Sequence, residues 1–281
     1  MTPLMTAVNL LHADTPQGVM DNPETWARRG VLLPHALAVL EHAIPVFEST
    51  ADPELGILVS WLLNQAGVYL RFQGRGTQSR GLLEQALSIS EAVHGPEDEK
   101  VANALISLSR ILVNLGESRA ARPLIERAVR IDETVHGKEH PEVAADLNEL
   151  ATVLLDLEEA EEARLHAERA LDIVETTYGS HYPDVVTSLS SLARSLRVLG
   201  DAKAARLHAE RALNIVETTW GHNHPYIALH LYDLAFVLYD LGEKETARQL
   251  VTRALTVIEG WFDRDHPDAQ LYRRTLDELT P

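Results

Sequence analysis

The sequence predicts an all-α protein made of antiparallel helical hairpins that stack side by side as a solenoid. Three observations predict this fold class. One sequence template recurs along the chain at a step of 42 residues, apolar residues inside each copy have helical spacing, and a glycine follows most of the helical segments. Repeats of this length cannot bury their apolar faces alone, so they form stacked arrays.

The repeat is clearest where two copies are nearly identical. Residues 164–177 read RLHAERALDIVETT and residues 206–219 read RLHAERALNIVETT. The same step relates other positions, which belong to five successive units: Gly95, Gly137, Gly179 and Gly221; Ala86, Ala128, Ala170, Ala212 and Ala254; Leu63, Leu105, Leu147, Leu189 and Leu231. We therefore expect five tandem hairpin repeats over residues 54–266.

Residues 1–53 follow this period poorly, and we expect them to form a degenerate helical repeat with a loop. The apolar pattern predicts a short helix over residues 7–12 and a longer one over residues 34–48. Residues 14–23 contain two prolines and one glycine, which indicates a loop.

Each of the five units contains two predicted helices, which we call A and B. In helix A, Leu147, Leu150, Ala151 and Leu154 form an apolar stripe at i, i+3, i+4 and i+7. A glycine then suits the left-handed position that ends a helix; these glycines are Gly74, Gly116, Gly200 and Gly242. Helix B follows. Alanines of both helices are expected where the two helices approach closely; these are Ala151 of helix A and Ala163 and Ala170 of helix B.

Two positions depart from the template, and the chain ends in a lone helix. Glu158 replaces the glycine between two helices, so we expect that hairpin to turn differently, because a left-handed non-glycine residue costs about 1 kcal/mol. Pro123 falls inside a helix B, where we expect a kink or a late helix start. Residues 267–281 are expected to form a C-terminal capping helix.

Composition excludes several classes of function. The formal net charge is −17, which disfavours nucleic-acid binding. The chain has no cysteine, which excludes disulfides, thiolate metal sites and cysteine nucleophiles. Neither an N-terminal leader pattern nor 18 uninterrupted apolar residues occurs, so we expect a cytoplasmic protein that does not enter a membrane. His222 and His224 are close in sequence but lack a third ligand, and we expect no metal and no cofactor.

The template resembles a known family. Leu147, Asn148, Leu150, Ala151, Ala163, the run Glu168–Leu171, Gly179 and Pro183 resemble the tetratricopeptide repeat in its 42-residue form, as in kinesin light chains. This resemblance covers residues 54–267 and implies a right-handed superhelix. Residues 22–26 and 32–37 are also similar to the region that opens the repeat arrays of bacterial signalling NTPases of the NB-ARC (STAND) class, although the chain has no phosphate-binding glycine loop.

The tetratricopeptide resemblance implies a concave groove lined by the A helices, in which such arrays bind extended peptides or partner segments. Carrying over the groove positions of that family gives candidate ligand-binding residues, which are Asn64, Arg71, Arg110, Asn148, Thr152, Arg194, Arg197, Tyr232, Phe236 and Tyr239. The recurrent asparagine of the family is replaced at Ile106, Ser190 and Tyr232. Asn148 would pair with the backbone of an extended ligand, since a carboxamide both donates and accepts hydrogen bonds.

Two features of this set suggest the chemistry of the ligand. Four arginines point toward the groove of an acidic chain, and guanidinium groups bind carboxylates or phosphates in pairs of hydrogen bonds, so an acidic ligand is predicted. Tyr232, Phe236 and Tyr239 share one helical face and form a candidate apolar anchor site. The alternative is that these rings pack on the neighbouring helix and that the arginines pair with Glu149, Asp156 or Asp233.

The sequence is therefore interpreted as a non-catalytic module that binds a peptide or a partner protein segment in its groove, and the arginines predict that this ligand is acidic. Two alternatives stay open. One is a sensor or self-assembling array of a STAND-type regulator, whose edge helices at 31–48 and 268–279 would contact another subunit, including a second copy of this chain, or a fused NTPase domain. The other is an enzyme that uses Arg197, Tyr239 and Asp240 for acid–base chemistry, although no catalytic motif is visible.

Overall fold

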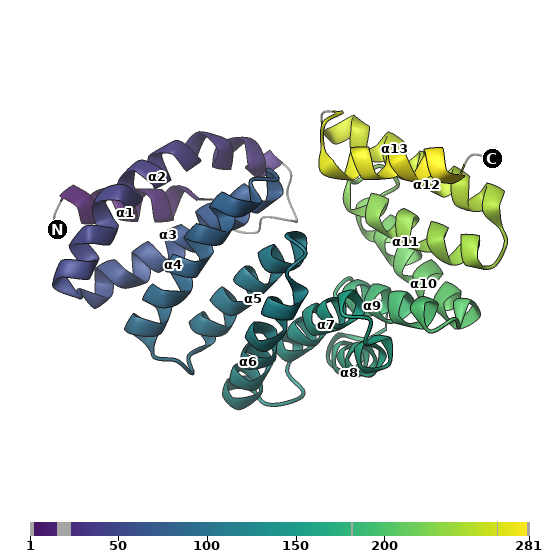
Figure 1. Cartoon of the computed structure of the whole chain (residues 1–281), viewed down its shortest axis with the longest axis horizontal. Helices are drawn as coiled ribbons and strands as arrows, with labels where there is room; N and C mark the ends of the chain where they lie inside the picture. The colour runs from purple at the N-terminus through teal and green to yellow at the C-terminus, as the bar shows by residue number, and fades with distance from the viewer. Residues whose placement is uncertain (1–2, 16–23, 181, 263, 280–281) are drawn as a thin grey trace. The chain divides into compact units, whose positions relative to one another are not determined.

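The computed structural model describes residues 3–15, 24–180, 182–262 and 264–279, and these residues form thirteen helices and no strand. Figure 1 shows the helices in chain order. The chain divides into two compact units, residues 1–135 and 136–281. The prediction of an all-α fold built from helical hairpins is confirmed.

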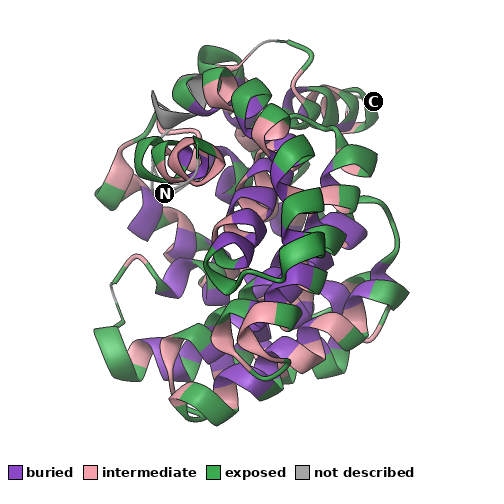
Figure 2. Cartoon of the chain, turned by 90° about the vertical axis from the view of Figure 1, so that its left-hand side faces the viewer, coloured by how far each residue is buried: buried purple, intermediate pink, exposed green. Residues whose placement is uncertain are grey.

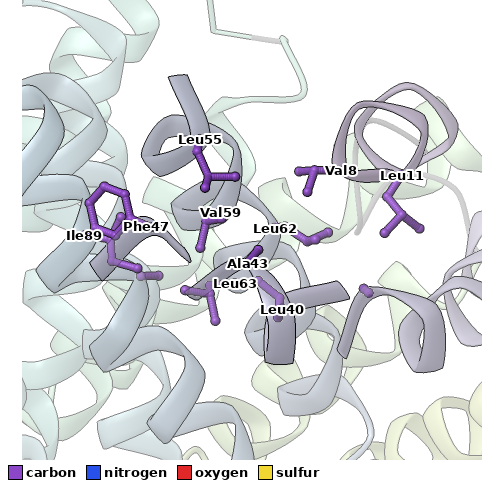
Figure 3. Packing of buried hydrophobic residues seen from close by; sticks show 12 residues of the cluster. Val8, Leu11, Leu40, Ala43, Phe47, Leu55, Val59, Leu62, Leu63 and Ile89 are labelled. Carbon is purple, nitrogen blue, oxygen red and sulfur yellow. The ribbon is translucent and has the colours of Figure 1, made fainter. Parts of the chain in front are cut away.

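The first unit contains six helices, which are α1 (Pro3–Asp14), α2 (Glu24–Thr50), α3 (Pro53–Phe72), α4 (Gly76–His94), α5 (Glu99–Asn114) and α6 (Ser118–His136, which ends one residue beyond the unit). Apolar residues of α1 to α4 share one core, in which Val8, Val59 and Leu63 are fully buried. Figure 3 shows Leu40 of α2 and Ile89 of α4 in this same cluster. The described helices α1 and α2 are therefore packed against α3 and α4, the first hairpin of the array.

The second unit contains seven helices, which are α7 (Pro141–Asp156), α8 (Ala160–Tyr178), α9 (Val185–Val198), α10 (Ala202–Trp220), α11 (Tyr226–Asp240), α12 (Lys244–Trp261) and α13 (Pro267–Leu279). Each helix packs against the next one along the chain. In addition, α7 contacts α9 and α9 contacts α11, so the A helices of this unit lie side by side. This arrangement brings the candidate groove residues of successive repeats next to one another.

Burial follows the predicted stripes. The repeated leucines Leu147, Leu189 and Leu231 are fully buried, and so are Ala151, Ala163 and Ala170 at the predicted close approaches. Figure 2 shows that buried and exposed stretches alternate within individual helices, as expected when one face of each helix packs on its neighbours. The small side chains let the helices approach, and the leucines fill the space between them.

The turns within the hairpins use the left-handed conformation that the glycines predict. Gly200 has φ of 87°, and its N–H donates to the carbonyl of Arg197 at 3.0 Å. The N–H of Asp201 reaches back to the carbonyl of Leu196 at 2.9 Å. These bonds satisfy carbonyl groups that the end of a helix would otherwise leave without partners.

The prediction of a different turn at Glu158 is wrong. Glu158 has φ of 64°, and the same two bonds form: its N–H donates to Leu155 O at 3.1 Å, and Glu159 N–H donates to Leu154 O at 2.9 Å. Packing of α7 on α8 imposes the turn that the other repeats make, so the backbone of Glu158 adopts a left-handed conformation that favours glycine.

Two helices begin earlier than expected. α6 begins at Ser118 and continues through Pro123, so this helix does not start late. α2 begins at Glu24, ten residues before the expected start, and contains Pro34 and Pro45 within one helix. Burial of the apolar face of each helix offsets the lost backbone hydrogen bonds. The predicted helix over residues 7–12 extends over Pro3–Asp14; residues 16–23 of the predicted loop lie outside the described part of the chain.

Arginines of helix B link each repeat to the loop that precedes it. Arg127 donates to the carbonyl of Pro96 at 2.6 Å and to Glu91 at 2.5 Å. Arg211 makes the equivalent bonds to Ser180 O and Glu175. The series also includes Arg169, which donates to Lys138 O, and Arg253, which donates to His222 O and pairs with Glu217. These side chains satisfy loop carbonyls and hold neighbouring repeats in register.

One described helix is long and apolar enough, by length and composition alone, to cross a membrane. This segment of α2, residues 28–50, has a mean hydropathy of 1.5, and 28% of it is buried. Val31 is 62% exposed and Val46 is 40% exposed, while Leu40 and Ala43 of the same helix lie in the core of the first unit. Two valines therefore lie on the outward side of α2, among exposed polar residues such as His35, Glu41 and Glu48.

The turn at Glu158 generates a stability prediction. Glu158→Gly should raise the free energy of unfolding by about 0.5–1 kcal/mol, because glycine adopts φ of 64° without steric strain. The reciprocal change Gly200→Glu, in the equivalent turn, should lower it by a similar amount. Urea unfolding followed by circular dichroism measures both. A neutral or destabilising Glu158→Gly would show that the turn is not strained.

Candidate ligand-binding site

A cluster of polar and aromatic side chains lies on the A helices of the second unit. Arg197 of α9 pairs with Asp240 of α11 at 3.2 Å, and its guanidinium lies 5.3 Å from the ring centroid of Phe236. Phe236 in turn packs edge-on against Tyr232, with 4.8 Å between ring centroids. The structure thus brings together four residues of α9 and α11, three of which the sequence predicted to share a groove.

The aromatic part of this cluster extends to α13. The ring of Tyr232 lies 4.6 Å from that of Tyr272, and the Tyr232 hydroxyl is hydrogen-bonded to Thr275 at 2.9 Å. Tyr272 is 3% exposed, and burial raises its pKa. Sequence reasoning missed both α13 residues. The repeat step could have indicated them, because residues about 40 positions apart meet across adjacent A helices.

Tyr239 lies one turn beyond Phe236 and is 38% exposed. The ammonium group of Lys244 lies 5.3 Å from its ring centroid. Tyr239 therefore presents an amphipathic ring to solvent at the end of α11, close in sequence to Asp240. Of the residues named for acid–base chemistry, Arg197 and Asp240 are joined in one ion pair.

Arg194 differs from Arg197 because its half-buried side chain forms no hydrogen bond or ion pair with any residue that the structure describes. Its charge acts on Asp233 of α11, which is half-buried beside Tyr232. Burial raises the pKa of Asp233 to about 6, while Arg194 and Arg197 act in the opposite direction. The expected pairing of an arginine with Asp233 is thus a longer-range attraction, and Arg197 pairs with Asp240 instead.

Asn148 and Thr152 lie two helices away, on α7. Asn148 is 3% exposed, and its Nδ2 donates to Ser188 Oγ of α9 at 2.8 Å. Its Oδ1 is buried and has no hydrogen-bond partner among the described residues. Thr152 Oγ1 donates to the carbonyl of Asn148 at 3.2 Å. The NH2 group of this carboxamide therefore forms a hydrogen bond between two A helices, while its oxygen has no hydrogen-bond partner among the described residues.

A similar bond joins the next pair of A helices. Ser190 of α9 is hydrogen-bonded to Nδ1 of His230 of α11 at 3.0 Å. His230 is 2% exposed, and burial lowers its pKa to about 4. The imidazole therefore stays neutral near pH 7, which makes this pair a structural link rather than a serine activated by a strong base.

The remaining candidates belong to the first unit. Asn64 of α3 is half-buried, and its Oδ1 has no hydrogen-bond partner among the described residues. Arg71 lies over the ring of Phe72, 4.5 Å from its centroid. Arg110 is exposed on α5. These three residues therefore lie on the A helices of their own unit, and the cluster described above belongs to the second.

The histidines that precede the repeated prolines act in turns, as their positions in the template indicate. His140, His224 and His266 each accept a hydrogen bond on Nδ1 from the backbone N–H two residues later, at 3.2–3.3 Å. His222 lies 3.1 Å from Glu217. Within the described ranges, no three His, Asp or Glu side chains are grouped as metal ligands.

Comparison with family models identifies the fold of the array. The tetratricopeptide repeat model matches residues 58–134, 114–176, 142–218 and 187–260. The chain belongs to the tetratricopeptide repeat family. The predicted family is thereby confirmed, and its members are typically protein interaction modules. No curated protein sequence matches this chain.

Three solved structures resemble this tetratricopeptide array, and at 23% identity or less they show the fold alone. BtubC (BKLC) from P. vanneervenii is 18% identical, with a TM-score of 0.60 and 92% of each chain covered. Repeats assigned to a kinesin light chain from Podosopora anserina are 23% identical, with a TM-score of 0.56, covering 70% of this chain and 92% of that one. A Rap protein in complex with competence and sporulation factor is 15% identical, with a TM-score of 0.65, covering 98% and 87%.

The buried histidine generates a prediction about acid. His230 has a folded pKa of about 4 and an unfolded value near 6.5, so its contribution to stability is present above pH 6.5 and is lost as pH falls toward 4. His230→Leu should remove this loss. The stability difference between the variant and the original protein should shift in favour of the variant by about 2 kcal/mol between pH 7 and pH 4.5.

Urea unfolding at the two pH values measures this shift. The matched control is His35→Leu, at a solvent-exposed position of α2, and its stability difference from the original protein should not change with pH in the same way. A pH-independent difference for His230→Leu would mean that His230 does not titrate in this range.

Proposed function

We propose that this protein is a non-catalytic interaction module that binds an acidic segment of another protein on the A-helix surface of α9, α11 and α13. The observation that carries the proposal is Arg194, a half-buried guanidinium with no ion pair among the described residues. It lies one helical turn from Arg197, whose guanidinium packs on the ring of Phe236 in the aromatic cluster with Tyr232. A guanidinium in this setting offers its hydrogen-bond donors to an incoming carboxylate.

The surroundings of Arg194 suit a segment that carries both a carboxylate and apolar side chains. Phe236 is half-buried and Tyr239 is 38% exposed, so both rings have surface left to cover. Val198, at the end of α9, and Leu229, near the start of α11, are 52% and 48% exposed. Aromatic and arginine side chains are the residues that most often dominate the energy of protein interfaces.

The charges of the protein favour an acidic ligand only close to the proposed site. The chain carries a net charge of −17, which repels an acidic segment at a distance. Screening limits that repulsion to about 8 Å at physiological ionic strength. Within this distance a carboxylate of the ligand meets Arg194, which no ion pair neutralises, and Arg197 one turn away. Affinity should therefore depend on these two side chains more strongly than on other arginines.

The relatives agree with a binding role without naming a ligand for this chain. The Rap protein of similar fold was solved in complex with competence and sporulation factor. That complex concerns the Rap protein; for this chain it supports the general proposal that such an array holds another polypeptide segment.

Replacement of both arginines tests the proposal. The ligand is first captured from native cells, and calorimetry then compares the original protein with Arg194→Glu/Arg197→Glu. We expect the double variant to lose at least about tenfold in affinity, because each charge reversal replaces attraction by repulsion, while helicity is unchanged.

The matched control reverses two exposed arginines elsewhere, Arg119→Glu/Arg130→Glu, which changes the net charge by the same amount. This control should retain most of the affinity. Equal affinities of the two double variants would remove the assigned role of Arg194 and Arg197.

A second candidate function rests on α2. The outward side chains Val31 and Val46 are exposed, and the apolar segment 28–50 is only 28% buried. These features favour the alternative of a sensor or self-assembling array whose edge helix contacts another subunit or a STAND-type NTPase domain. Residues 22 and 23 of the NB-ARC-like motif lie outside the described residues. Mass measured across a range of concentrations, with Val31→Lys/Val46→Lys as the disrupting variant, distinguishes self-assembly from a monomeric module.

A further inference from the structure

Asp233 lies among the cationic and phenolic groups of the candidate site. Its carboxyl is half-buried on α11 and interacts electrostatically with Arg194 and Arg197 of α9. Its negative charge also raises the pKa of Tyr232 on its own helix and of Tyr272 on α13. The carboxyl therefore faces the same three helices that form the proposed binding surface.

Two carboxyl groups of α11 lie near the two guanidinium groups of α9, but only one of them forms an ion pair. Asp240 closes a 3.2 Å ion pair with Arg197. The Ser190–His230 hydrogen bond and the Arg197–Asp240 ion pair fix the register of α9 against α11 on either side of Arg194 and Asp233. Asp233 therefore lies near enough to attract Arg194, but it forms no ion pair or hydrogen bond with it. Arg194 thus has a nearby internal carboxylate that is less well placed than the carboxylate of a bound ligand would be.

We propose that Asp233 is a built-in competitor for acidic ligands, so that neutralising its carboxyl group exposes the charge of Arg194 and strengthens binding. This inference rests on the function proposed above and adds its regulation. Because binding and protonation are linked, an acidic ligand that occupies Arg194 makes the ionised form of Asp233 less favourable, and the protein takes up a proton as the ligand binds.

The pKa of Asp233 determines the pH range in which its carboxyl group competes with the ligand. Burial raises the pKa of Asp233 to about 6, so the carboxyl is ionised at pH 7.5 and largely neutral at pH 5.5. The nearest histidine on the same helix, His230, has a pKa of about 4 and stays neutral throughout this range. The other groups that face this carboxyl, Arg194, Arg197, Tyr232 and Tyr272, do not change charge there.

The experiment uses hexa-aspartate as the probe, with hexa-asparagine as the uncharged control, and compares the original protein with Asp233→Asn. At pH 7.5 the variant should bind hexa-aspartate about fivefold more tightly than the original protein, and at pH 5.5 the two affinities should converge. Calorimetry at pH 6.5 in two buffers of different ionisation enthalpy should show uptake of a fraction of a proton by the original protein, and none by the variant.

Asp172→Asn is the matched control, because Asp172 is an exposed aspartate on the outer helix α8 and its replacement changes the net charge equally. Its affinity and proton uptake should equal those of the original protein. If hexa-aspartate binds equally to all three proteins with equal proton uptake, the role of Asp233 is overturned and the proposed function stands. If none of the proteins binds hexa-aspartate in preference to hexa-asparagine at either pH, both are overturned.

Discussion

The constraint on which this structure depends is the burial of two apolar faces by every helical hairpin. One hairpin covers only one of its own faces, so it is stable only with a neighbour placed one repeat away. Alanines such as Ala151 and Ala170 allow the helices to approach, and Leu147, Leu189 and Leu231 fill the interior. Within the second unit this packing sets the A helices side by side, and every other feature of the candidate site follows from that placement.

Side-by-side A helices bring residues about 40 positions apart into contact. Asn148 meets Ser188, Ser190 meets His230, and Tyr232 meets Thr275 of the lone terminal helix. The same geometry makes α13 part of the proposed binding surface, since Tyr272 and Thr275 of this helix contact Tyr232. A helix that sequence patterns describe as a cap therefore also completes a cluster of functional side chains.

The electrostatics of the cluster connect packing with function. Arg194 and Arg197 lie one turn apart on α9, facing Asp233 and Asp240 on α11. Arg197 and Asp240 form an ion pair, whereas Arg194 and Asp233 do not. Asp233 is held partly inside the protein, where its charged form is poorly solvated, so its pKa is raised. In the proposed function, a carboxylate of the ligand replaces this internal interaction, and the affinity would therefore be coupled to the protonation of Asp233.

The sequence by itself determined the helices, the turns at glycine and the family, because these depend on spacing within a few residues and on a template that repeats. It also placed Arg197, Tyr232 and Phe236 on one surface. Only the tertiary structure decided that Glu158 makes a glycine-type turn and that α6 continues through Pro123, because packing outweighs local preference. It also decided that Asn148 is buried against Ser188 and that Tyr272 joins Tyr232. Such contacts join residues far apart along the chain, and their partners follow from the packing of whole helices.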